Sequence, residues 1–410
     1  MNIDSARLTR ELLQLATFSE APSPAVTRVV FTATDLQARA FVKGLCAEAG
    51  LTVREDAVGN TFARWTGSAP HLPAIGTGSH IDAIPNAGAY DGTVGVLGGL
   101  EAIRALQRAG LRPQRSLELL TFTAEEPTRF GIGCLGSRFL SGLLDSQAGE
   151  RLKDRDGLTL NQARTAAGFT GELTSVPLSN HYYAAFIELH IEQGPLLEQS
   201  GVSVGIVTAI AAPASLRVTI EGVGGHAGAV LMPGRRDAFL AAAELALAVE
   251  AAAKQTDAID TVATTGVCHV FPGAVNSVPS RCDLEIDVRD IVQARRDAVL
   301  ETITRAAREI AARRQVSIRT ELLNADPPAQ CAPAVVEALA QSCGEAQIAY
   351  DRMISRAYHD SLFMSRIAPT AMLFIPCRDG VSHRPDEYAT PEHIAQGVHI
   401  LALTMARLAG

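Results

Sequence analysis

The chain has 410 residues, of which 47% are hydrophobic, and its formal net charge is −8. This length is enough for two or three packed units, and an acidic balance without a Lys/Arg cluster argues against nucleic acid as a partner. No uncharged apolar stretch reaches the roughly 18 to 20 residues that a membrane span needs. The seven cysteines show no CxxC spacing, and the N-terminal segment lacks the features of a signal peptide. We therefore expect a cytoplasmic protein with reduced thiols and no membrane partner.

Up to about residue 205, short apolar runs alternate with helical stretches, and this alternation predicts an α/β unit with a largely parallel sheet. The runs end in residues that carry chemistry: His80, Glu125 and His190 all lie at or near such ends. Since ligands of parallel sheets gather at the carboxyl ends of the strands, these three side chains are expected to converge on one site.

The pattern changes at about residue 212. Strands are predicted at 215–225, 262–271 and 282–290, and long helices at 235–255 and 291–314. Helices on one face of an antiparallel sheet would form a smaller α+β lobe over 212–328. The α/β pattern then resumes, with an apolar strand at 369–377 and a helix from Pro391. We expect one α/β domain built from 1–211 and 329–410, with the smaller lobe inserted.

The stretch GTGSHIDAIPNAGAYDG, residues 76–92, holds His80, Asp82 and Asp91 among glycines. His80 and Asp82 are one residue apart, so Asp82 could orient the imidazole of His80 from behind. Asp91 immediately precedes Gly92 and an apolar-periodic helix. It could be a metal ligand, or simply the N-cap of that helix, a role in which Asp is favoured.

A second cluster, TAEEPTRF at residues 123–130, has two adjacent carboxylates at the end of an apolar strand. Neighbouring residues in extended backbone point in opposite directions, so Glu125 and Glu126 would have different tasks. One could bind metal while the other transfers protons. The alternative is a solvated strand end without function.

Two further histidines complete a candidate metal site. Each of them could instead be an ordinary hydrogen-bonded structural residue. Together, three imidazoles and two carboxylates suffice for two divalent cations that share one carboxylate, and such nitrogen and oxygen donors suit Zn or Mn. The five candidate ligands are His80, Asp91, Glu126, His190 and His383.

The chain resembles the M20 family of dinuclear metallo-amidohydrolases and peptidases, in its hydantoinase/carbamoylase branch. That branch includes N-carbamoyl-L-amino acid hydrolases, allantoate amidohydrolases and ureidoglycolate amidohydrolases. The resemblance extends over nearly the whole chain. Its motifs, in order, are GSHIDAIPNAGAYDG, TAEEPTRFGIGCLGSR, ELHIEQGP, GVGGHAG, VNSVP, DLEIDVRD, YHDS and SHRPDEY.

The resemblance implies a zinc-peptidase-like catalytic domain, an inserted lid and dimerisation domain, and a homodimer. It implies that His80 and His190 bind one metal ion, that Glu126 and His383 bind the other, and that Asp91 bridges them. Glu125 would be the general base. The peptide bond after Asp91 is often cis in the family, and the glycines around it would allow the sharp bend that brings His80 and Asp91 together.

The resemblance also implies contacts to substrate. Arg289 would clamp a carboxylate, unless it is an ordinary surface arginine of a charged strand, and Asn276 would contact substrate. His226 would stabilise the oxyanion of the tetrahedral intermediate, unless it is only a loop histidine. Gln193 could hydrogen-bond the ureido group.

The substrate class implied is a small ureido or N-carbamoyl acid. Tyr358 stands where carbamoylases are expected to have a glycine-bearing loop, so it would narrow the pocket or add a hydroxyl contact, or it is a packing residue. This favours ureidoglycolate, with an N-carbamoyl-L-amino acid or allantoate as alternatives. His359 and Asp360 would support the site from behind its ligands. Rival hypotheses are an aminoacylase or peptidase of the same fold, and a non-catalytic binding protein.

Overall fold

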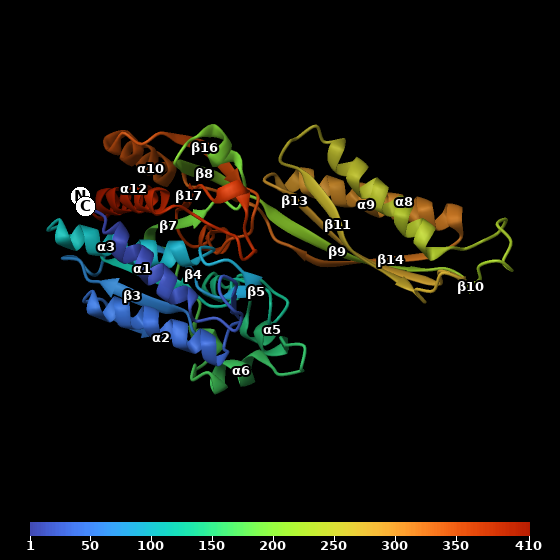
Figure 1. Cartoon of the computed structure of the whole chain (residues 1–410), viewed down its shortest axis with the longest axis horizontal. Coiled ribbons are helices and arrows are strands. Elements are labelled where there is room, and N and C mark those ends of the chain that lie inside the picture. The colour runs from blue at the N-terminus through green and yellow to red at the C-terminus, as the bar shows by residue number, and fades with distance from the viewer. The chain divides into compact units, whose positions relative to one another are not determined.

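The computed structural model describes all 410 residues, and the chain divides into two compact units (Figure 1). The first unit comprises Met1–Thr208, Cys331–Ser355 and His359–Gly410, and the second comprises Ala209–Gln330 and Arg356–Tyr358. The middle of the chain is thus inserted between two parts of the first unit.

A mixed sheet runs through the first unit, with strand order β15-β8-β17-β7-β4-β6-β3-β2 and β16 paired to β8. Its centre is parallel, from β17 through β7 and β4 to β6, and the flanking pairs are antiparallel. The sequence predicted a largely parallel sheet. The sheet is mixed because β2 and β3 form a short hairpin, and because β8, which follows β7 after helix α7 (Leu196–Ser200), lies antiparallel beside β17. The strands are β2 (Thr52–Glu55), β3 (Thr61–Trp65), β4 (Ala74–His80), β6 (Leu117–Phe122), β7 (Tyr183–Ile191), β8 (Val204–Ile210), β15 (Ala329–Gln330), β16 (Tyr350–Ser355) and β17 (Thr370–Ile375).

Helix α3 (Thr93–Arg108) packs on the central strands and against the last helix, α12 (Pro391–Ala409). Every residue of α3 from Thr93 to Leu106 is buried, as expected for a helix that is apolar almost all round. None of the helices has the length and apolar character needed to cross a membrane. The other elements of the unit are α1 (Ser5–Ala16), α2 (Ala33–Glu48), α4 (Leu135–Leu140), α5 (Ser146–Arg151), α6 (Leu160–Ala166), α10 (Pro333–Ala346), α11 (Ser361–Met364), the 3-10 helices η1 (Leu173–Ser175) and η2 (Arg378–Gly380), and the paired strands β1 (Val26–Arg28) and β5 (Ala83–Ala87).

The second unit is an antiparallel sheet, with strand order β11-β13-β9-β14, and two helices, α8 and α9 (Figure 1). Alternate residues of β13, namely Leu284, Ile286 and Val288, are buried in one core with residues of both helices, which is the period-2 pattern that the sequence predicted. A separate pair, β10 and β12, is antiparallel. The elements are β9 (Ala212–Glu221), β10 (Gly225–His226), α8 (Ala238–Lys254), β11 (Val262–Phe271), β12 (Ser277–Val278), β13 (Arg281–Asp290), α9 (Gln293–Arg314) and β14 (Ser317–Ala325).

Candidate metal centre

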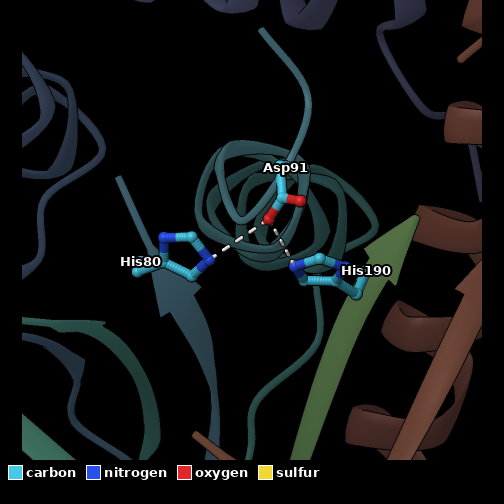
Figure 2. A group of neighbouring side chains, drawn as sticks. All are labelled: His80, Asp91 and His190. Carbon is cyan, nitrogen blue, oxygen red and sulfur yellow. Dashed lines mark ion pairs between the residues drawn. The ribbon is translucent and has the colours of Figure 1, made fainter. Parts of the chain in front are cut away.

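Two histidines and one aspartate meet at the carboxyl edge of the parallel strands in the first unit (Figure 2). His80 is the last residue of β4, and His190 lies near the end of the neighbouring strand β7. Asp91 comes from the loop before α3. Its Oδ1 lies 3.4 Å from Nε2 of His80 and 3.2 Å from Nε2 of His190. All three residues are buried, so the group is a compact set of nitrogen and oxygen donors removed from water.

The backbone orients both imidazoles. Nδ1 of His80 lies 3.0 Å from the carbonyl oxygen of Asp82, and Nδ1 of His190 lies 2.9 Å from the carbonyl oxygen of Ile191. Each ring therefore turns its Nε2 atom toward Asp91. An Nδ1–H bonded to a carbonyl leaves Nε2 as the acceptor nitrogen, which is the tautomer that a metal ion requires; in this structure Nε2 of His190 accepts the backbone N–H of Gly92 at 3.0 Å.

Gly92 makes the sharp turn between Asp91 and α3. Its φ is +65°, and a Cβ atom at this position would lie 2.5 Å from the ring of His80. Gly92 is the N-cap of α3 and Asp91 makes no capping bond, so the N-cap alternative for Asp91 is wrong. The expectation of a cis peptide bond after Asp91 is also wrong. The cis bonds of the chain are Ser23–Pro24 and Phe271–Pro272, and the turn is achieved by the positive φ of glycine instead.

A second group adjoins the first and shares Asp91 with it. Nε2 of His383 lies 3.5 Å from Oδ2 of Asp91 and 3.3 Å from Oε1 of Glu126. The hydrogen bond to Glu126 raises the pKa of His383 to about 9. Asp91 thus presents Oδ1 to one group and Oδ2 to the other, which is the arrangement of a carboxylate that can bridge two cations. His383 is the exposed member, with 45% of its side chain accessible.

Asp82 supports the two glutamates. Its carboxylate accepts hydrogen bonds from the backbone N–H groups of Glu125, at 3.2 Å, and Glu126, at 3.1 Å. The sequence predicted that this carboxylate orients His80, but its Oδ1 is 3.7 Å from Nδ1, and the backbone carbonyl of Asp82 makes that contact. Both glutamates are buried, so the alternative of a solvated strand end is wrong. Glu125 points its Oε2 to within 3.8 Å of Nε2 of His80 and accepts a bond from the thiol of Cys134.

Further buried polar residues lie behind His190. The ring of His359 is 4.6 Å from that of His190, edge to face, and Glu188 joins them in a third group of donor atoms. Asp360 is fully buried and accepts a bond from the hydroxyl of Ser137. The predicted supporting residues therefore lie close to the site. Glu188 was missed, although a carboxylate inside the apolar run AAFIELHI is a signal of a buried polar site.

Three residues besides the histidines contact Asp91: Gln193, Ser382 and Glu387. Gln193 donates through Nε2 and Ser382 through its hydroxyl to Oδ2 of Asp91, each at 2.6 Å. The third, Glu387, accepts the backbone N–H of Asp91 at 3.0 Å. Burial, followed by the nearby Asp91 charge, raises the pKa of Glu387 to about 7. Sequence reasoning assigned no role to Ser382 or Glu387, although both stand in the SHRPDEY motif.

The remaining predicted substrate contacts belong to the second unit. His226 pairs with Ser277 across β10 and β12, and the carbonyl oxygen of Asn276 accepts the N–H of Ala227, so His226 and Asn276 lie side by side. Both are exposed. This pair forms a polar surface within its own unit.

Arg289 and Tyr358 also lie in the second unit, and both have partners there. The guanidinium of Arg289 pairs with Asp287 at 2.8 Å and donates to the carbonyl of Arg356 at 3.2 Å. The hydroxyl of Tyr358 donates to Asp326. These bonds fix the direction of both side chains.

A mixed sheet with buried imidazoles and carboxylates at the edge of its parallel strands is the arrangement of an α/β protein whose side-chain cluster is compatible with metal binding. The chain belongs to peptidase family M20/M25/M40, whose match covers residues 76–407. The match confirms the family resemblance that the motifs suggested.

The relatives of the chain are amidohydrolases. It is 54% identical to the ureidoglycolate hydrolase of Arabidopsis thaliana, over 100% of this chain and 87% of that protein. It is 38% identical to the N-carbamoyl-L-amino acid amidohydrolase of Geobacillus stearothermophilus, over 99% of both. Among solved structures, AtUAH in complex with glyoxylate is similar with a TM-score of 0.90 and 53% identity, over 100% of this chain and 98% of that one.

Proposed function

We propose that the protein hydrolyses a linear C–N amide bond of a small ureido or N-carbamoyl acid, and that ureidoglycolate is its preferred substrate. The observation that carries the proposal is the position of Asp91, which offers one carboxylate oxygen to each of two adjacent donor groups beside Glu125. The choice of substrate is supported by 54% identity to a ureidoglycolate hydrolase over the full length of the chain.

We propose that the two groups bind two divalent metal ions, Zn or Mn. His80 and His190 would hold one ion, Glu126 and His383 the other, and Asp91 would contact both. The donor set fits this assignment, because imidazole nitrogen and carboxylate oxygen suit these metals and the donor atoms of each group lie within 4.8 Å of one another. When bound, such ions polarise a carbonyl group and lower the pKa of water.

Glu125 is proposed as the general base. Its carboxylate would take a proton from the attacking water as the oxygen adds to the substrate carbonyl carbon. As the C–N bond breaks, Glu125 would return this proton to the leaving nitrogen, which departs as ammonia, and the carbamate product would release carbon dioxide. Burial raises the pKa of Glu125 well above its ordinary value, and the cations proposed beside it would lower that pKa and favour the carboxylate form that a general base needs.

Substrate recognition is proposed for Gln193, Arg289, His226 and Asn276. Gln193 is supported by its 2.6 Å bond to Asp91, which directs its amide to the ligand cluster. Arg289 would clamp the substrate carboxylate and His226 would stabilise the oxyanion, with Asn276 beside it. For Tyr358, the bond to Asp326 favours the packing role that the sequence left open.

We also propose a homodimer formed through the second unit. Strand β11 lies at one edge of the four-stranded sheet, and the neighbouring surface exposes Leu247, Ile259 and Val262, at 66%, 85% and 39%. An edge strand with apolar neighbours is a surface that another chain can extend. Sedimentation at assay concentration should give twice the chain mass of 43.3 kDa, and a species of the chain mass would contradict the dimer.

The function is tested by ammonia release. Metal-stripped protein, reconstituted with Mn or Zn, is assayed with ureidoglycolate, allantoate and N-carbamoyl-L-amino acids of several sizes. Release that depends on metal, is fastest with ureidoglycolate and is lost in Glu125→Gln is the expected result. Preference for an N-carbamoyl-L-amino acid would favour the second candidate, to which the relative with 38% identity points. No release from any substrate would refute the proposal and favour an acylase or a binding protein.

A further inference from the structure

The ligands of the proposed second metal ion come from distant parts of the chain. Asp91 precedes α3, whereas His383 lies in the loop between η2 and α12. His383 has a φ of +60° and an exposed side chain, so the strand framework does not hold it as it holds His80 and His190. Some other contact must keep the loop of His383 close to Asp91.

The carboxylate of Glu387 makes that contact. Oε1 accepts the backbone N–H groups of Tyr90, at 2.8 Å, and Asp91, at 3.0 Å. Oε2 accepts the backbone N–H of His383, at 3.2 Å, and the hydroxyl of Ser382, at 3.1 Å. One buried side chain, 4% exposed, therefore bonds the backbone of one ligand with one oxygen and the backbone of the other ligand with the second.

Gly88 shows how closely Glu387 is fitted. A Cβ atom at residue 88 would lie 2.3 Å from Cβ of Glu387 and 2.5 Å from its Oε1. Any larger residue would therefore displace the carboxylate. The absence of a side chain at Gly88 therefore leaves the space that the carboxylate of Glu387 occupies beside the loop of Asp91.

We propose that Glu387 is a positioning residue of the metal centre, which ties the backbone of Asp91 to that of His383 and so fixes the separation of these two ligands. The inference rests on the proposed function, because it concerns the site proposed to bind metal. Groups behind metal ligands typically contribute about 10- to 100-fold to metal affinity. Glu387 bonds the backbone of Asp91, which is proposed to contact both ions, but also that of His383, which is proposed to hold only one. Its loss should therefore weaken mainly the ion held by Glu126 and His383.

The test is a Mn²⁺ titration of metal-free protein, with free Mn²⁺ measured by electron paramagnetic resonance. Wild type should bind two equivalents. In Glu387→Gln, the amide nitrogen would face a backbone N–H on one side, so that side loses its acceptor. We expect one equivalent to bind about 10- to 100-fold more weakly and the other to stay within about threefold. Excess Mn²⁺ should restore turnover with little change in KM for substrate.

Glu192→Gln is the matched control. Glu192 is also buried and accepts two backbone N–H groups, of Leu196 and Leu197, each at 2.8 Å, but it bonds no metal-ligand residue. It should lower the thermal midpoint and leave both Mn²⁺ equivalents in place. Gly88→Ala, which displaces Glu387 without altering it, should weaken the same equivalent.

The outcomes separate the two proposals. If wild type binds no Mn²⁺, the proposed metal centre fails, and the role of Glu387 fails with it. If wild type binds two equivalents and Glu387→Gln binds them equally well, only the role of Glu387 is overturned. Should Glu387→Gln not fold, Glu387→Asp and Gly88→Ala decide, and wild-type Mn²⁺ affinity in both folded variants would overturn the inference.

Discussion

Replacing Asp82 with asparagine tests how the general base is held. The carboxylate accepts the N–H groups of Glu125 and Glu126, and an asparagine oxygen can accept only from one side while its NH₂ group faces the other. One buried N–H is left without a partner, at a cost of about 1–3 kcal/mol. Burial raises the pKa of Asp82 to about 6, which means that the buried charge is itself unfavourable. Because asparagine carries no charge, the substitution removes this penalty, and we expect a loss of stability of about 1 kcal/mol, the lower end of the range of about 1–3 kcal/mol.

The effect on turnover should exceed the effect on stability. If Asp82 positions Glu125, Asp82→Asn should lower kcat about 10- to 100-fold with little change in KM, while urea unfolding of the metal-free protein shows the small loss above. Glu192→Gln is the control, because Glu192 also accepts two backbone N–H groups, of Leu196 and Leu197, with its two separate oxygens in the same unit. Equal stability losses in the two variants, with full kcat in Asp82→Asn, would refute the reasoning.

Three further predictions concern the turn, the surface and the metal. Gly92→Ala and Gly131→Ala both place a side chain at positive φ, which should lower the free energy of unfolding by about 1–2 kcal/mol in each variant. Only Gly92 lies against the ring of a proposed ligand, His80, so only Gly92→Ala should weaken Mn²⁺ binding in the titration. Hydrogen bonds from Arg314 and Arg313 lower the pKa of Glu244 from 4.5 to about 2. Their stabilisation is full above pH 4.5 and is lost as the pH falls toward 2, so the difference in Tm between wild type and Glu244→Gln should be larger at pH 7 than at pH 3; an equal difference would contradict the pairing. Mn²⁺ at one hundred times its dissociation constant should raise the free energy of unfolding by about 2.7 kcal/mol for each ion bound, and a Tm that does not change with Mn²⁺ would count against the site.

Much of the fold and the ligand set could be predicted because the signals are local. The terminal helix begins at Pro391 as predicted, and His80 and His190 were found because each ends an apolar run. The antiparallel margins of the sheet were missed because strand direction depends on connections rather than on composition. Glu387 was missed for a similar reason: its partner, the N–H of Asp91, is 296 residues away in the chain, and no local pattern records such a contact.

The strand order also has a consequence for synthesis. β17 lies between β7 and β8 in the sheet, yet the whole second unit is made before it. Until residues 370–375 emerge, β7 and β8 face each other across an unfilled position, each with an unpaired apolar edge of the kind that promotes aggregation. Pairing between strands that are far apart in the chain is slow, so the edges of β7 and β8 would stay exposed for longest during synthesis and would be the segments that a chaperone protects. The same late segment brings His383, and the chain therefore completes its sheet and its ligand set together.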